Sequence, residues 1–186
     1  MKRIISISIV VILTFFALRY LKYFFRYCVF GNEGWEAMDF DLAVSYLNYS
    51  KIFIVLVVTA LLFKKVPFEI LGLKKDVFKG MLLGFLFVIP MFIGYGIAVG
   101  FKTDITLKSA HMDIILAGFF EEFMFRGFLF GILFYYAGWA FISAVLIPSI
   151  FSGLGHLYQA ETLSDGISVF LFTCLGGAVF VCFYVA

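Results

Sequence analysis

Three ionisable side chains lie close together in the short segment Ala117 to Gly127. They are Glu121, Glu122 and Arg126, and the surrounding run is otherwise apolar and long enough to be buried in lipid. A charge at bilayer depth costs at least ~2.5–3.5 kcal/mol on insertion scales. Three such groups in one span therefore indicate either a chemical function or compensating partners.

The spacing of these residues predicts which of them compensate each other. Glu122 and Arg126 are four residues apart on a helix, with the acid on the N-terminal side, which is the favourable order for an ion pair. Glu121 lies about 100° around the helix from Glu122 and cannot point the same way. We expect Glu121 to face a water-filled cavity or a partner on another helix. The alternative is a buried structural ion pair beside one protonated glutamic acid.

Composition indicates a polytopic membrane protein before any motif is considered. Of the 186 residues, 64% are hydrophobic and 14% are charged, against ~25% charged in typical soluble domains. The net charge of +2 is too small to argue for a nucleic-acid partner. The three cysteines have no spacing typical of a disulfide framework or a metal site.

Hydropathy predicts an all-α transmembrane helix bundle of about six spans, multi-pass in the cell membrane and in contact with lipid. The predicted spans are 4–18, 44–63, 81–101, 114–136, 140–155 and 167–186. The segment that follows the first span, Arg19 to Tyr27, alternates cations with aromatic rings, a composition that suits the headgroup level of a membrane.

The fourth and fifth spans form a predicted helical hairpin about a tight turn near Gly138, so depth can be counted from that turn. Glu121 lies 17 residues before it and His156 lies 18 after it. At 1.5 Å per residue the two side chains come to similar depth on neighbouring helices. A carboxylate and an imidazole placed in this way are a plausible pair for activating water. The competing interpretation is an interfacial His156 that faces water, and His111 is interpreted as an ordinary loop residue.

At these residues the chain resembles the CPBP family of intramembrane proteases, which includes CAAX prenyl proteases and bacteriocin-processing, Abi-like proteins. Its first motif, Glu-Glu-x-x-x-Arg, is matched by Glu121, Glu122 and Arg126. Its second motif, Phe-x-x-x-His, is matched at His156 only, because Ser152 stands at the Phe position. The similarity extends over about residues 68–186, so we divide the chain into an N-terminal two-span region, 1–66, and a CPBP-like domain, 67–186.

The resemblance implies an all-helical membrane fold that hydrolyses a peptide bond of a membrane-associated or lipidated protein or peptide. By that likeness Glu121 activates water, His156 holds the water or a metal, and Glu122 with Arg126 supports the site. Zinc is the implied metal, with Glu121 and His156 as its candidate ligands, although a catalytic zinc usually takes three protein ligands.

The family also carries a third motif, a histidine followed four residues later by asparagine or a similar residue, on a further helix. This sequence ends before any such helix, so we expect a C-terminally incomplete domain whose activity is in question. Two other functional classes stay open. One is a non-catalytic immunity or regulatory protein that retains the fold, and the other is a small transporter that uses Glu121 as a proton site.

Overall fold

The computed structural model describes residues 2–73, 78, 82, 85–86, 89–90, 92–94, 96–97, 100–101 and 105–185. Within these residues the chain is helical and contains no strand, which confirms the predicted all-α class. The helices are α1 (Lys2–Arg19), α2 (Leu21–Phe24), η1 (Phe25–Val29), α3 (Gly31–Glu36), α4 (Phe40–Phe63), α5 (Pro67–Ile70), α7 (Leu107–Ala110), η2 (His111–Phe119), α8 (Phe120–Glu122), η3 (Phe123–Tyr136), α9 (Phe141–His156), η4 (Leu157–Gln159) and α10 (Leu163–Val185).

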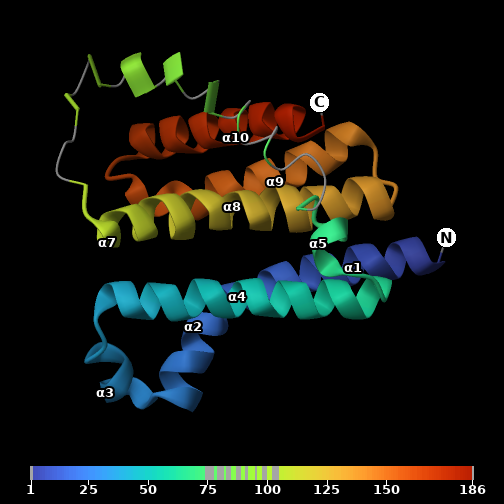
Figure 1. Ribbon diagram of the computed structural model, residues 1–186, viewed down its shortest axis with the longest axis horizontal. Helices are drawn as coiled ribbons and strands as arrows, with labels where there is room; N and C mark the ends of the chain where they lie inside the picture. The colour runs from blue at the N-terminus through green and yellow to red at the C-terminus, as the bar shows by residue number, and fades with distance from the viewer. Residues whose placement is uncertain are drawn as a thin grey trace.

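The helices pack in layers along one common direction (Figure 1). Helices α1 and α4 lie in the lower part of the view, the continuous run from α7 to η3 crosses the middle, and α9 and α10 lie above it. Helix α9 packs against both η3 and α10, and α1 packs against η3 and α4. The middle helix is thus covered from both sides.

The predicted number of six spans is not confirmed. Among the described residues, three helices are long and apolar enough to cross a membrane: Phe40–Phe63, Phe141–Gln159 and Leu163–Cys182. A fourth candidate is the pair Ile4–Arg19 and Leu21–Val29, which is bent by 50°. Nine of the 21 residues of the predicted third span, 81–101, lie outside the described residues, so this span as a whole stays a prediction.

The predicted fourth span, 114–136, lies in an unbroken helical run that differs from the expected α-helix. Most of this run has the wider π-helical winding, over η2 and η3, and only α8 between them is α-helical. Such turns are rare and are often found at functional sites.

Local sequence explains where several helices begin and end. Helix α4 begins after Asp39, whose carboxylate accepts hydrogen bonds from the backbone N–H groups of Asp41 and Leu42, a common N-cap arrangement. The run through η3 ends at Gly138, whose φ of 65° lies in the left-handed region that glycine tolerates. This turn forms the predicted hairpin between η3 and α9.

The main core is one cluster of buried apolar side chains centred on η3. Phe128, Leu129, Ile132 and Leu133 are fully buried there. They belong to a cluster that includes Val11 of α1, together with residues of α4 and the α5 end. The cluster therefore joins residues from both sides of the proposed 66/67 boundary, which itself stays a prediction.

Candidate functional site

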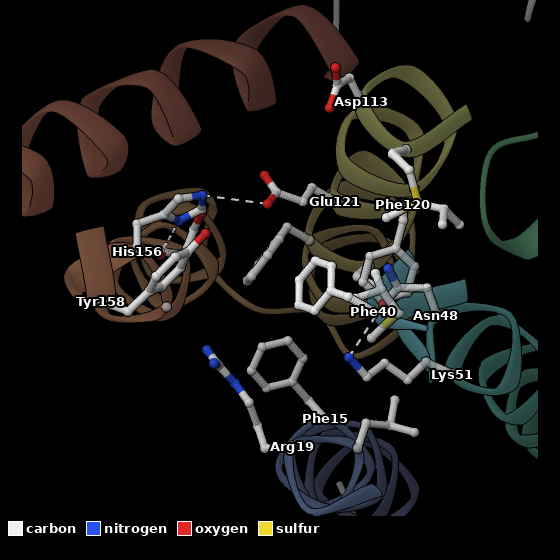
Figure 2. Close-up of a pocket in the computed structure, with 18 residues that line it drawn as sticks. Phe15, Arg19, Phe40, Asn48, Lys51, Asp113, Phe120, Glu121, His156 and Tyr158 are labelled. Carbon is white, nitrogen blue, oxygen red and sulfur yellow. Dashed lines mark hydrogen bonds and ion pairs between the residues drawn. The ribbon is translucent and has the colours of Figure 1, made fainter. Parts of the chain in front are cut away.

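The structure brings Glu121 and His156 together. Glu121 lies in α8, and His156 is the last residue of α9, just before the short turn η4. Their closest atoms, Glu121 Oε1 and His156 Nε2, are 3.4 Å apart, and Figure 2 shows the two side chains pointing toward each other from neighbouring helices. The approach predicted from matched depth is therefore observed, while the catalytic roles of the two residues stay a prediction.

A backbone hydrogen bond fixes the orientation of the His156 ring. Nδ1 lies 2.8 Å from the carbonyl oxygen of Ser152, four residues earlier on α9. A carbonyl only accepts, so Nδ1–H donates to it, and in the neutral ring Nε2 then carries a lone pair. This lone pair faces a carboxylate oxygen of Glu121. Two acceptors 3.4 Å apart need a shared proton or cation, or a water molecule beside them that donates a hydrogen bond to each. The side of the pair that faces the cavity has room for such a water.

Ser152 departs from the family's Phe-x-x-x-His motif, and the contact above shows what that departure leaves intact. The group that orients His156 is a main-chain carbonyl, which any residue at position 152 supplies. The serine side chain is buried, and Ser152 also lines the cavity beside the histidine. The substitution therefore changes the cavity wall and leaves the hydrogen bond to the imidazole in place.

Glu122 and Arg126 form the ion pair that their spacing predicts, with Oε1 and the nearest guanidinium nitrogen 3.1 Å apart. The Arg126 side chain is only 8% exposed, whereas that of Glu122 is 49% exposed. The guanidinium also lies over the ring of Phe180 in α10, 5.3 Å from its centroid. This pair ties the turn that carries Glu121 to α10, and its supporting role in chemistry stays a prediction.

The Glu121–His156 pair opens onto a cavity of about 550 Å³ whose walls come from α1, α4, the run η2 to η3, and the end of α9. Most of the lining is apolar, including Phe15, Leu18, Phe120 and Phe125. The polar lining residues besides the pair are Arg19, Asn48, Lys51, Asp113, Ser152 and Tyr158. The site therefore has a few polar groups in an apolar chamber, as ligand pockets usually do.

The sequence pattern assigns no role in this cavity to two cations that line it, Arg19 and Lys51. Arg19 begins the segment that is expected at the headgroup level, and in the structure its guanidinium donates a hydrogen bond to the Phe151 carbonyl of α9 at 3.3 Å. Lys51 lies over the ring of Phe120 at 5.3 Å from the centroid. The available signal was the cost of a cation inside an apolar helix, the argument already applied to Glu121.

At the edge of this cavity, α4 is tied to the helical run that carries Glu121. Lys108 and Asp41 form an ion pair at 2.6 Å, and the hydrogen bond from this pair, followed by the charge of Asp39, raises the pKa of Lys108. His111 Nε2 and Tyr49 Oη lie 2.7 Å apart. The interpretation of His111 as a loop residue is wrong, because η2 begins at His111 and the residue is fixed by Tyr49.

A zinc ion would find an incomplete ligand set among the described residues. His156 Nε2 and a Glu121 oxygen are suitable donors, and the bond from Nδ1 to a carbonyl is the usual outer support of a metal-binding histidine. No group of three or more His, Cys, Asp or Glu side chains that would hold a metal occurs in the described part of the chain. Glu122 is engaged by Arg126. Zinc binding therefore stays a prediction.

The comparison with known families falls on the segment that contains this pair. Residues 104–186 match the Rce1-like family, described as type II CAAX prenyl endopeptidase Rce1-like. The resemblance to CPBP proteins is thereby confirmed for this segment, which is similar to a CAAX protease family. No curated protein and no solved structure matches the chain. The Rce1-like segment carries Glu121, Glu122, Arg126 and His156, whereas Arg19 and Lys51 lie outside it.

Proposed function

We propose that this protein is an intramembrane endopeptidase that hydrolyses a peptide bond in a membrane-associated or lipidated protein or peptide. The observation that carries the proposal is the 3.4 Å approach of Glu121 and His156 at the wall of a largely apolar cavity. Membership of the pair in the Rce1-like segment supports the same reaction class.

The proposed reaction begins with a water molecule on the cavity side of the pair, which donates hydrogen bonds to the carboxylate of Glu121 and to Nε2 of His156. Glu121 takes a proton from this water as its oxygen attacks the carbonyl carbon of the scissile peptide bond. The new C–O bond gives a tetrahedral intermediate. When the C–N bond breaks, Glu121 returns the proton to the leaving amine, so that one water is consumed and an acid and an amine are formed.

Three other features of the site support this reaction. The Nδ1–H bond to Ser152 keeps the imidazole lone pair directed at the water position. The Glu122–Arg126 pair neutralises the second acid of the motif, so only Glu121 is free to act as a base. The apolar lining suits lipid chains or apolar side chains next to the cleaved bond.

The test is cleavage of a lipidated C-terminal peptide by the full chain in lipid nanodiscs, with Glu121→Gln as the variant. Glutamine keeps the size of the side chain and cannot accept the proton, so we expect the rate to fall by about 10²–10⁴. Glu161→Gln is the matched control, because Glu161 is exposed in the connection before α10 and does not line the cavity.

A rate for Glu121→Gln equal to that of the wild type contradicts the mechanism. If the wild-type chain shows a cooperative thermal transition, it is folded. If such a folded chain cleaves no lipidated or membrane-associated peptide, that result favours the non-catalytic immunity or regulatory role instead. In that case Glu121→Gln leaves the biological effect intact.

A further inference from the structure

Two cations line the same cavity as the catalytic pair. Arg19 comes from the end of α1 and Lys51 from the middle of α4, and both line the cavity with Glu121 and His156. In Figure 2 the Arg19 and Lys51 side chains lie on the side of the chamber away from Asp113. The cavity therefore has a basic wall, contributed by helices outside the Rce1-like segment.

Arg19 is held close to the residue that precedes His156. Its guanidinium donates to the Phe151 carbonyl, and a Cβ placed on Gly155 would lie 3.0 Å from one of its nitrogens. Glycine at this position thus leaves room for the guanidinium against the last turn of α9. One carbonyl satisfies only a small part of a group with five N–H donors.

Lys51 is held close to the residue that precedes Glu121. Its ammonium lies over the ring of Phe120 and 3.5 Å from the side-chain oxygen of Asn48. Neither contact carries a negative charge. The charge of Arg19 acts on Lys51 as well, so the two cations repel each other across the chamber when no anion is present.

Three other cations of the described chain have carboxylate partners, whereas Arg19 and Lys51 do not. Arg26 pairs with Glu36, Lys108 with Asp41 and Arg126 with Glu122. The exposed Lys22, Lys64 and Lys65 also have no ion pair with a described residue, but they do not line the cavity. Among the described residues, no carboxylate lies within ion-pair distance of Arg19 or Lys51, although Asp113 and Glu121 line the same cavity. Lys51 is half-buried and shares the cavity with the exposed Arg19. A partly buried cation that faces a second cation is costly unless an anion offsets the two charges.

From this arrangement we infer that Arg19 and Lys51 form a subsite for the free C-terminal carboxylate of the peptide that is cleaved. The inference rests on the proposed function, because it places the anion on the substrate. The arginine fork matches the two oxygens of a carboxylate, and the subsite shares one chamber with the catalytic pair. The bound carboxylate and the peptide bond that reaches Glu121 then belong to the same substrate molecule. The two cations offset the repulsion between this carboxylate and that of Glu121.

The experiment measures binding rather than turnover. The Glu121→Gln protein in neutral-lipid nanodiscs is titrated with one fluorescent lipidated peptide in two forms, a C-terminal acid and a C-terminal amide. We expect the acid to bind about tenfold tighter, the scale of one charge-assisted hydrogen bond. Adding Arg19→Gln or Lys51→Gln removes most of this preference and leaves the affinity for the amide unchanged. Lys22→Gln is the matched control, an exposed cation near Arg19 that does not line the cavity, and it keeps the preference.

Three results overturn the subsite. They are equal affinity for the acid and the amide, an equal loss of both affinities in Arg19→Gln and Lys51→Gln, and loss of the acid preference when phosphatidylglycerol is added to the nanodiscs at constant peptide. The last result assigns the cations to a lipid phosphate. Binding is measured without cleavage, so the two proposals can fail separately. If the acid is preferred but no peptide is ever cleaved, only the proposed function is contradicted. If peptides are cleaved but the acid is not preferred, only the subsite is contradicted.

Discussion

At the residue scale, the hydrogen bond between His156 and the Ser152 carbonyl shows that the histidine of the second motif is oriented without the phenylalanine that usually precedes it. The bond comes from the main chain, so the identity of residue 152 matters mainly through the shape of the cavity wall. We expect Ser152→Ala to cleave within a few-fold of the wild-type rate with an unchanged thermal transition. Cleavage assays and thermal unfolding of the purified variant check this. A loss as large as that of Glu121→Gln would assign the serine hydroxyl a direct role.

The Glu122–Arg126 pair predicts an asymmetry between its two members. In Glu122→Gln a buried guanidinium loses its counter-ion and cannot release its charge. In Arg126→Met a half-exposed carboxyl is left, which can neutralise itself by taking up a proton. Breaking a buried pair costs about 3–5 kcal/mol, and the exposure of Glu122 reduces this to roughly 1–3 kcal/mol. We expect Glu122→Gln to lower the thermal transition more than Arg126→Met. The opposite order of the two transitions would mean that Glu122, and not Arg126, is the group that cannot tolerate the loss of its partner.

At the element scale, the position of His156 depends on how closely α9 can approach α10. A Cβ on Gly153 would lie 2.7 Å from Cys174 Sγ and 2.8 Å from a ring carbon of Phe170. We expect Gly153→Ala to destabilise the protein by about 1–3 kcal/mol, as overpacking does, and to slow cleavage because His156 is on the same helix end. Gly176→Ala is the control, since its Cβ meets nothing, and a better helix former there stabilises by about 0.5–1 kcal/mol. Thermal unfolding of both variants makes the comparison, and equal transitions would show that the two helices move apart at no cost.

The elements themselves were largely predictable from the sequence, because apolar length and turn residues are local properties. Hydropathy predicts spans at 44–63, 140–155 and 167–186, and the structure has helices at 40–63, 141–156 and 163–185, so the ends differ by up to four residues. The turn near Gly138 follows from the glycine. The 50° bend after Arg19 and the π-helical winding around Glu121 did not follow, since both depend on packing against helices distant in sequence.

The part of the site formed by residues close in sequence was also predictable. Glu121 and His156 lie on two helices joined by one tight turn, so counting residues from that turn was enough to bring them together. Arg19 and Lys51 reach the same chamber from helices that precede Glu121 by 102 and 70 positions in the numbering. No pattern in the local sequence predicts that α1 packs on η3, so only the structure shows that these two cations line the cavity.

At the scale of the whole molecule, α1 belongs to the core rather than acting as a separate anchor. Phe15 is 5% exposed and its ring packs on those of Phe125 and Phe151. We expect Phe15→Ala to cost about 3 kcal/mol, the lower end for a buried Phe-to-Ala change, because lipid also solvates apolar side chains of separated helices. Leu13→Ala, at a 62% exposed position of the same helix, is the control. Thermal unfolding in detergent compares them, and similar transitions would mean that α1 is dispensable.

The number of residues in the π-helical run Phe123–Tyr136 determines the direction in which Glu121 points relative to His156. Each residue of a helix advances the chain by roughly a quarter of a turn, and η3 separates Glu121 from the turn that leads to α9. Deleting one residue from η3 would rotate Glu121 by that amount relative to His156, even if every remaining side chain kept its chemistry. The distance between Glu121 and His156 therefore depends on the number of residues in η3 as well as on their chemistry.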